Sequence, residues 1–215
     1  MTTIFFLRHA ESLANELGVL AGRTPGISLS ERGSKQAKGL VKELSKYEFD
    51  VVISSPLDRC IQTIDPFRQK ADITIVEMED FQEMDYGNWS GKELKALAQK
   101  KEWKIIQNNP QTFTFAKGES FRNAAKRVKN ALVSIEKHFK GQNVLIVSHG
   151  DIIKIAITLL LGLQLKHFQK ITIDPASLTA FNIEAQKLLF LNQKSKKRWN
   201  GNLNQRFQLG GGTDR

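Results

Sequence analysis

Three short apolar runs, spread along the chain, each lead into a stretch whose apolar residues recur at helical spacing. The runs are "IFFL" (4–7), "VVI" (51–53) and "VLIV" (144–147). Continuous apolar runs that alternate with helical patterns are typical of parallel strands covered by helices on both faces. The pattern therefore predicts an α/β fold, a three-layer α/β/α sandwich with a mainly parallel central sheet. Residues 177–192 are expected to add a late antiparallel hairpin.

Residues that bind anions stand where these runs end. Arg8 and His9 follow the first run, Arg59 lies shortly after the second, and His149 follows the third. The carboxyl ends of parallel strands and the N-termini of the following helices meet at one edge of the sheet, where backbone N–H groups favour anions. Guanidinium groups bind phosphate through paired hydrogen bonds. The sequence therefore predicts a pocket for a doubly charged anion, such as phosphate, at this edge.

Local signals predict where two of the helices begin. Ser55 is followed by Pro56. Serine is favoured as a helix N-cap, and proline is tolerated at the first helical position. We therefore expect a helix that begins at Pro56 and carries Arg59 in its first turn. The pattern of residues 10–17, after the first apolar run, predicts a second helix there.

Composition limits the class of protein. A chain of 215 residues is long enough for one sizeable core. Its single cysteine, Cys60, excludes an intramolecular disulfide and a zinc site built on thiolates, which indicates a cytoplasmic setting. The apolar stretch at 155–163 is shorter than the ~20 residues that span a bilayer. We expect neither a signal peptide nor a membrane partner.

The formal net charge of +10 is compatible with a nucleic-acid partner, an anionic membrane surface or a small anionic substrate. Much of the excess lies in residues 192–215, where six Lys or Arg stand with Asp214 as the one acidic residue. We expect residues 193–215 to form a solvated, basic, Gly-rich tail rather than a nucleic-acid site. Residues 1–192 are then expected to form a single domain.

Signatures of several other phosphate enzymes are missing. The chain has no G-x-x-x-x-G-K-[ST] loop, and Pro66 stands where a cysteine phosphatase would place arginine after Cys60. We therefore expect Cys60 to be a core residue. Histidine can form a covalent intermediate with a transferred group. Arginines can hold the phosphoryl oxygens and their charge, so this chemistry on His9 requires neither a metal nor another cofactor.

Six segments, in order, resemble the phosphoglycerate-mutase-like branch of the histidine phosphatase superfamily. The opening "LRHAESLAN" (7–15) is similar to the R-H-G motif of that family, with Ala10 in place of the usual glycine. The resemblance continues through residues 22–37, 54–63, 81–91, 118–128 and 144–154. It implies the family's α/β/α fold and a phosphohistidine mechanism.

The resemblance also implies roles for individual residues. His9 corresponds to the phosphorylated nucleophile, and Glu83 to the carboxylate of the family's E-x-x-x-G-x-W pattern, which protonates the leaving oxygen and later activates water. Composition alone does not distinguish Glu83 from its acidic neighbours. Residues 90–118 are expected to form a helical insertion over the pocket. The residues implied to bind substrate are Arg8, Asn15, Gly22, Arg23, Arg59, His149 and Gly150, and the catalytic set is His9, Glu83, Arg8, Arg59 and His149.

Three functions stay open at this point. The first is a metal-independent phosphatase that hydrolyses a small phosphorylated metabolite; the second is a phosphoglycerate-type mutase, which returns the phosphoryl group to its product. The third is a non-catalytic module that binds an anion or nucleic acid, but such a module needs neither His9 nor Glu83. Residues 90–118 contain no Tyr and no Arg, and lysine lacks the bidentate fork that grips a second phosphate. This composition favours hydrolysis over mutase activity.

Overall fold

The central sheet contains six strands in the order β3-β2-β4-β1-β5-β6. In the computed structural model, which describes residues 1–194, β1 pairs with β4, β4 with β2 and β2 with β3 in parallel. β5 pairs antiparallel with β1 and β6, so the predictions of a mainly parallel sheet and a late hairpin are confirmed. The strands are β1 Thr3–Arg8, β2 Val51–Ser54, β3 Ile75–Glu77, β4 Asn143–Ser148, β5 Leu178–Asn182 and β6 Lys187–Gln193.

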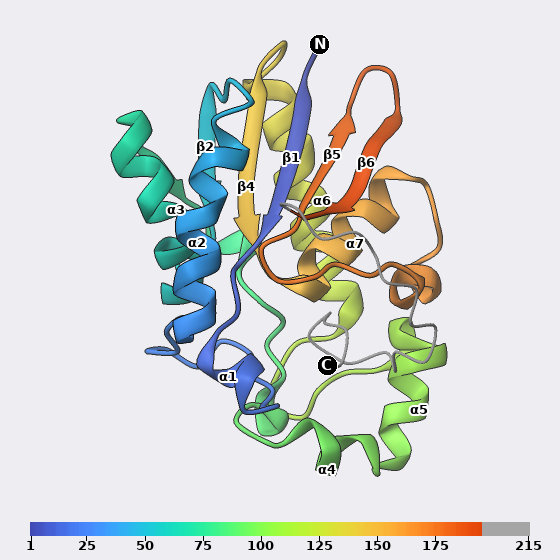
Figure 1. Ribbon diagram of the computed structural model, residues 1–215. Helices are drawn as coiled ribbons and strands as arrows, with labels where there is room; N and C mark the ends of the chain where they lie inside the picture. The colour runs from blue at the N-terminus through green and yellow to red at the C-terminus, as the bar shows by residue number, and fades with distance from the viewer. Residues whose placement is uncertain (195–215) are drawn as a thin grey trace.

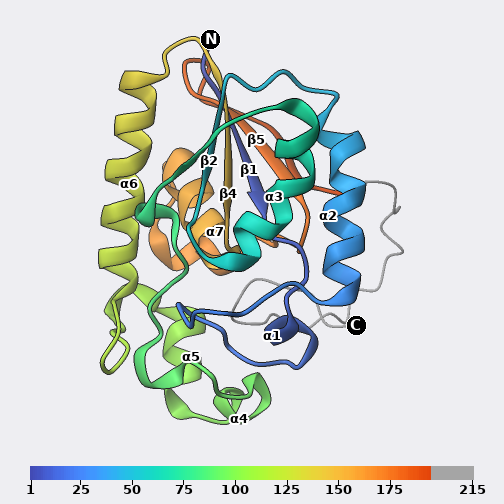
Figure 2. The ribbon, with the colours of Figure 1, turned by 90° about the vertical axis from the view of Figure 1, so that its left-hand side faces the viewer.

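Helices cover both faces of this sheet (Figures 1 and 2). On one face lie α2 (Glu31–Leu44) and α3 (Asp58–Ala71), and on the other lie α6 (Phe121–His138) and α7 (Gly150–Leu160). The predicted three-layer α/β/α sandwich is confirmed by this arrangement. Of the predicted tail, residues 195–215 lie outside the described residues.

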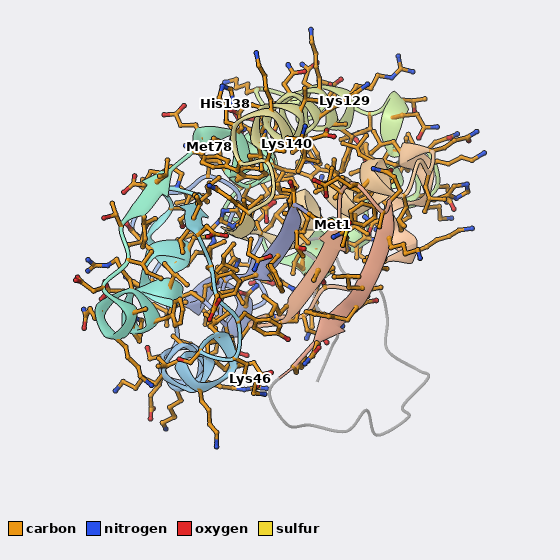
Figure 3. The ribbon with its side chains drawn as sticks, turned by 90° about the horizontal axis from the view of Figure 1, so that it is seen from above. Met1, Lys46, Met78, Lys129, His138 and Lys140 are labelled. Atoms are coloured by element: carbon orange, nitrogen blue, oxygen red, sulfur yellow. The ribbon has the colours of Figure 1, made fainter. Side chains whose placement is uncertain are left out.

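Strand β1 illustrates why two separate cores form. Ile4 and Phe6 belong to the apolar cluster that contains residues of α6 and α7, whereas Phe5 and Leu7 belong to the cluster that contains residues of α2 and α3. Successive side chains of a strand point to opposite faces, so an unbroken apolar run supplies both cores at once. Many charged side chains are exposed: seen from above, Lys46 and Lys129 lie on opposite sides of the molecule (Figure 3).

Two predicted helix starts are wrong. α3 begins at Asp58 with Leu57 as its N-cap, because Leu57 has extended backbone (φ −70°, ψ 134°), and Ser55 therefore does not cap it. Arg59 nevertheless lies in the first turn, as predicted. The helix expected over residues 10–17 shortens to α1 (Leu13–Glu16), because the Ser12 side chain caps the chain at that point.

Residues 90–118 contain two short α-helices, α4 (Leu94–Ala98) and α5 (Lys101–Asn108), and the 3₁₀ helix η3 (Pro110–Thr112). In Figure 1 α4 and α5 lie, together with α1, beyond the carboxyl ends of β1 and β4. Trp89 stacks on Trp103 of α5 with ring centroids 6.4 Å apart, which ties this segment to the larger core.

Two glycines of α2 provide a test of the packing between α2 and the segment after β1. A Cβ on Gly33 would lie 1.9 Å from the carbonyl oxygen of Glu11, whereas a Cβ on Gly39 would meet no atom within 4 Å. We predict that Gly33→Ala lowers the free energy of unfolding by about 1–3 kcal/mol, because the backbone must shift. Gly39→Ala should raise it by roughly 0.5–1 kcal/mol through helix propensity alone. Urea unfolding of both variants measures this difference, and equal effects would contradict the packing described.

Candidate active site

The carboxyl ends of the parallel strands bring the predicted cations and histidines together. Arg8 ends β1 and His9 follows it, Arg59 is the second residue of α3, and His149 is the N-cap of α7. All four side chains are buried, with at most 3% of the residue exposed. The rings of His9 and His149 lie 5.2 Å apart between centroids.

His9 has the chemistry of a nucleophile. Its Nδ1 lies 2.7 Å from the carbonyl oxygen of Ala10, so Nδ1 carries the proton and Nε2 keeps its lone pair. Burial lowers the pKa of His9 well below its ordinary value of 6.5, and the charges of Arg59 and Arg8 lower it further. The imidazole is therefore neutral at physiological pH. The Cβ of Ala10, where the family usually has glycine, is accommodated in an apolar cluster with Leu29.

His149 is held by a residue that the sequence patterns did not assign to the site. Ser55 Oγ lies 2.8 Å from His149 Nε2 and so fixes the ring. Burial, followed by the charge of Arg59, lowers the pKa of His149 well below its ordinary value. Cys60 Sγ lies 3.5 Å from the same nitrogen, but burial raises the pKa of this thiol to about 12. Cys60 is thus a protonated core residue, as predicted.

Each buried arginine donates a hydrogen bond to a backbone carbonyl. Arg8 Nη1 bonds Ile173 O at 2.7 Å, and Arg59 Nη2 bonds Gly22 O at 2.8 Å. Gly22 has φ +55°, and a Cβ there would lie 2.6 Å from Ser90 Oγ, so glycine is required at this turn. These bonds fix both guanidinium groups before any ligand arrives.

Glu83 lies between η1 (Glu79–Phe81) and η2 (Gly87–Trp89), in a segment without helix or strand, and is 5% exposed. Its Oε1 accepts a hydrogen bond from Met84 N at 2.9 Å. Burial, and next the negative charge of Asp151, raise the pKa of Glu83 to about 7, although the nearby arginines oppose the shift. A carboxyl with this pKa can both donate and accept a proton near neutral pH.

Three other residues predicted to contact substrate differ in their position and in their hydrogen bonds. Asn15 is exposed, and its Oδ1 accepts hydrogen bonds from Ser12 N and Ser12 Oγ in the cap of α1. Arg23 donates through Nε to Glu83 O at 2.9 Å and through Nη2 to Glu119 at 3.1 Å. Gly150 is buried at the first position of α7. Contact of these residues with substrate stays a prediction.

A buried polar network adjoins Glu83 and was not found from the sequence. Tyr86 donates to Asp151 Oδ2 at 2.8 Å, and Lys154 Nζ lies 3.5 Å from Asp151 Oδ1 and 3.1 Å from Gln169 Oε1. Asp151 and Lys154 are three residues apart on α7, but Tyr86 lies 65 residues from Asp151, so no local spacing reveals that contact. Within residues 1–194, no group of three or more His, Cys, Asp or Glu side chains is placed to hold a metal ion.

A sequence profile of the histidine phosphatase superfamily (branch 1) matches residues 4–194. This chain belongs to that superfamily. Over 193 residues it is 32% identical to phosphoserine phosphatase 1 of Hydrogenobacter thermophilus, a match that covers 89% of this chain and 91% of that protein. A putative alpha-ribazole-5'-P phosphatase from Escherichia coli superposes with a TM-score of 0.81 at 25% identity, over 92% of this chain and 99% of its own.

Another solved relative carries a bound acid. Phosphoserine phosphatase from Entamoeba histolytica, in complex with 3-phosphoglyceric acid, superposes with a TM-score of 0.80 at 25% identity, over 92% of this chain and 98% of its own. Family membership and these relatives identify the protein as a phosphatase of the metal-independent phosphomonoesterase class. Among the described residues, no helix is long and apolar enough to cross a membrane.

The raised pKa of Glu83 predicts a pH-dependent cost to stability. Its ordinary value is 4.5, so between about pH 4.5 and pH 7 the unfolded chain releases a proton that the folded protein retains. The contribution of Glu83 to stability therefore falls as pH rises through this window. We predict that Glu83→Gln raises the free energy of unfolding relative to wild type, by roughly 2–3 kcal/mol more at pH 8 than at pH 5.

Urea unfolding at the two pH values measures this effect. Glu136→Gln, on the exposed side of α6, is the matched control and should show no comparable change between pH 5 and pH 8. If Glu83→Gln showed the same stability difference from wild type at both pH values, the assigned pKa of Glu83 would be wrong.

Proposed function

We propose that the protein hydrolyses a small phosphate monoester through a phosphohistidine intermediate on His9, with Glu83 as general acid and base. The observation that carries this proposal is the state of His9: a buried, neutral imidazole whose Nδ1 is tied to Ala10 O, so that Nε2 is the nucleophilic nitrogen. The two fixed guanidinium groups beside it provide the charge that phosphoryl transfer requires.

In the first half-reaction, Nε2 of His9 attacks phosphorus and the bond from phosphorus to the ester oxygen breaks. Glu83 gives its proton to the leaving oxygen, which departs as an alcohol, and becomes a carboxylate. Arg8 and Arg59 hold the phosphoryl oxygens, and His149 lies beside them.

In the second half-reaction, the Glu83 carboxylate takes a proton from water as the water attacks phosphorus. The bond between phosphorus and nitrogen breaks, phosphate leaves, and His9 recovers its lone pair. Glu83 is protonated again, so the cycle closes without a metal ion or another cofactor. A pKa of about 7 fits this alternation, because neither charge state of Glu83 is strongly disfavoured near neutral pH.

We propose a small phosphorylated metabolite in a cytoplasmic setting as the substrate, with no nucleic-acid or membrane partner. Phosphoserine is the first ester to test, because the relative from Hydrogenobacter thermophilus is a phosphoserine phosphatase. The substrate contacts would come from Asn15, Gly22 and Gly150, whereas Arg23, the remaining residue predicted to bind substrate, donates to Glu83 O and to Glu119. Residues 90–118 would form an insertion that helps to select the leaving group, within a single domain whose last strand, β6, includes Gln193.

We predict that His9 carries phosphate during turnover. Rapid acid-free quench of the enzyme with labelled substrate should trap an acid-labile, base-stable adduct, and His9→Ala should abolish both the adduct and turnover. The control is His138→Ala, because His138 lies exposed at the end of α6. Undiminished turnover in His9→Ala would eliminate His9 as the nucleophile.

The role of Glu83 predicts a dependence on the leaving group. Phenyl phosphate and 4-nitrophenyl phosphate have similar shapes, but only the poorer phenol leaving group needs a proton in the transition state. Glu83→Gln should therefore lower kcat/KM, which reports the first half-reaction alone, by about 100-fold or more for phenyl phosphate and far less for 4-nitrophenyl phosphate. Equal losses on the two esters would mean that Glu83 is not the general acid.

Hydrolysis should exceed mutase activity. The cations of residues 90–118 are all lysines, which cannot grip a second phosphate or a carboxylate in a bidentate manner. The dephosphorylated product should therefore leave, and water should attack phospho-His9. Phosphate release and interconversion of 2- and 3-phosphoglycerate, measured on one protein sample, decide between the two activities. Interconversion that outruns hydrolysis would favour the mutase.

A further inference from the structure

The general acid proposed above lies on a segment that no regular secondary structure holds. Residues 82–86 belong to neither a helix nor a strand. The carboxyl of Glu83 is fixed on one side by Met84 N, but this contact is local and does not position the segment against the histidine site. A general acid must lie within hydrogen-bond reach of the leaving oxygen, so another part of the protein has to place this backbone.

Two arginines from distant parts of the sequence donate to the backbone of Glu83. Arg23 Nε lies 2.9 Å from Glu83 O, and Arg127 Nη2 lies 3.2 Å from the same oxygen. Arg127 Nη1 also donates to Asp80 O. The backbone is thus held at Glu83 O, within the segment, and at Asp80 O, just before it, by arginines of the loop after α1 and of helix α6.

Glu119 joins the two arginines into one unit. Its Oε1 accepts from Arg23 Nη2 at 3.1 Å, from Arg127 Nη2 at 2.8 Å and from Asp85 N at 3.0 Å. The Glu119 side chain is 13% exposed and that of Arg127 is 17% exposed, so water screens this ion pair less than an ordinary surface pair, whereas the Arg23 side chain is 35% exposed. We call Arg23, Glu119 and Arg127 the arginine clamp.

The geometry of Arg23 suits a clamp better than a phosphate contact. Its Nε and Nη2 point to two different acceptors within the protein, which fixes the plane of the guanidinium group. A lysine ammonium at this position lacks the planar fork needed to span both acceptors with the same geometry. Arg8 and Arg59, by contrast, are fully buried beside His9.

We propose that Arg23 is a positioning residue for the general acid: with Glu119 and Arg127 it holds the Glu83 backbone so that the carboxyl faces the leaving oxygen. This inference rests on the proposed role of Glu83 and assigns Arg23 a task other than binding substrate. It predicts that substitutions in the arginine clamp slow the same esters that Glu83→Gln slows, to a smaller extent, and do not weaken substrate binding.

The test measures kcat and KM for phenyl phosphate and 4-nitrophenyl phosphate in Arg23→Lys and Arg127→Lys. We expect each variant to lower kcat/KM for phenyl phosphate by about tenfold, since small displacements of a catalytic group are costly. For 4-nitrophenyl phosphate we expect a loss of less than about twofold, because this leaving group needs no proton. In a Glu83→Gln background, Arg23→Lys should cost less than about a further twofold on either ester.

Arg68→Lys is the matched control, because Arg68 pairs with Asp65 on the exposed surface of α3 and should leave both esters unaffected. A raised KM on both esters with unchanged kcat in Arg23→Lys would show that Arg23 binds substrate, and would overturn the proposal. The proposal would also be overturned if Arg23→Lys lowered activity by the same factor in the Glu83→Gln background as in the wild-type protein. If Arg23→Lys fails to fold, by thermal melting, the same criteria apply to Arg127→Lys.

The outcomes also separate this inference from the proposed function. If Glu83→Gln itself shows no dependence on the leaving group, the assignment of Glu83 as the acid fails. If Glu83→Gln shows that dependence and neither clamp variant does, the assignment of Glu83 stands and the clamp is wrong.

Discussion

The burial of two guanidinium groups at the carboxyl edge of the sheet is the constraint on which the rest of the site depends. Positive charge removed from water is costly unless hydrogen bonds and opposite charges compensate it. Arg8 and Arg59 each bond a backbone carbonyl, and the carboxyls of Glu83, Asp151 and Asp174 act on Arg8. The arginines are thus fixed in advance, so binding a phosphate dianion requires little rearrangement.

The same charges determine the states of the neighbouring residues. Two buried arginines disfavour a protonated imidazole, which adds to the effect of burial and keeps His9 and His149 neutral. Glu83 responds in the opposite sense: burial and Asp151 together outweigh the arginines and leave its carboxyl with a pKa of about 7. One electrostatic environment therefore supplies both a neutral nucleophile and a carboxyl that can carry a proton.

The strands could be predicted from the sequence, because an apolar run such as residues 4–7 is a local signal. The edge at which the cations gather could be predicted as well, because the carboxyl ends of parallel strands meet at one edge of a sheet. The choice of Glu83 among its acidic neighbours depended on a family pattern. Ser55 was misjudged because serine before proline has a common local meaning, whereas its actual partner, His149, lies 94 residues away. Contacts at such separations, including that of Arg23 with Glu119, cannot be detected from the spacing or periodicity of residues in the sequence.

We propose that Nε2 of His9 receives the phosphoryl group because Nδ1 donates its proton to Ala10 O. The most direct measurement is phosphorus and nitrogen magnetic resonance of the trapped phosphoenzyme, with the histidines labelled with nitrogen-15. We expect phosphorus to couple to Nε2 of His9 and Nδ1 to keep its proton. Coupling to Nδ1, or to a nitrogen of His149, would contradict it.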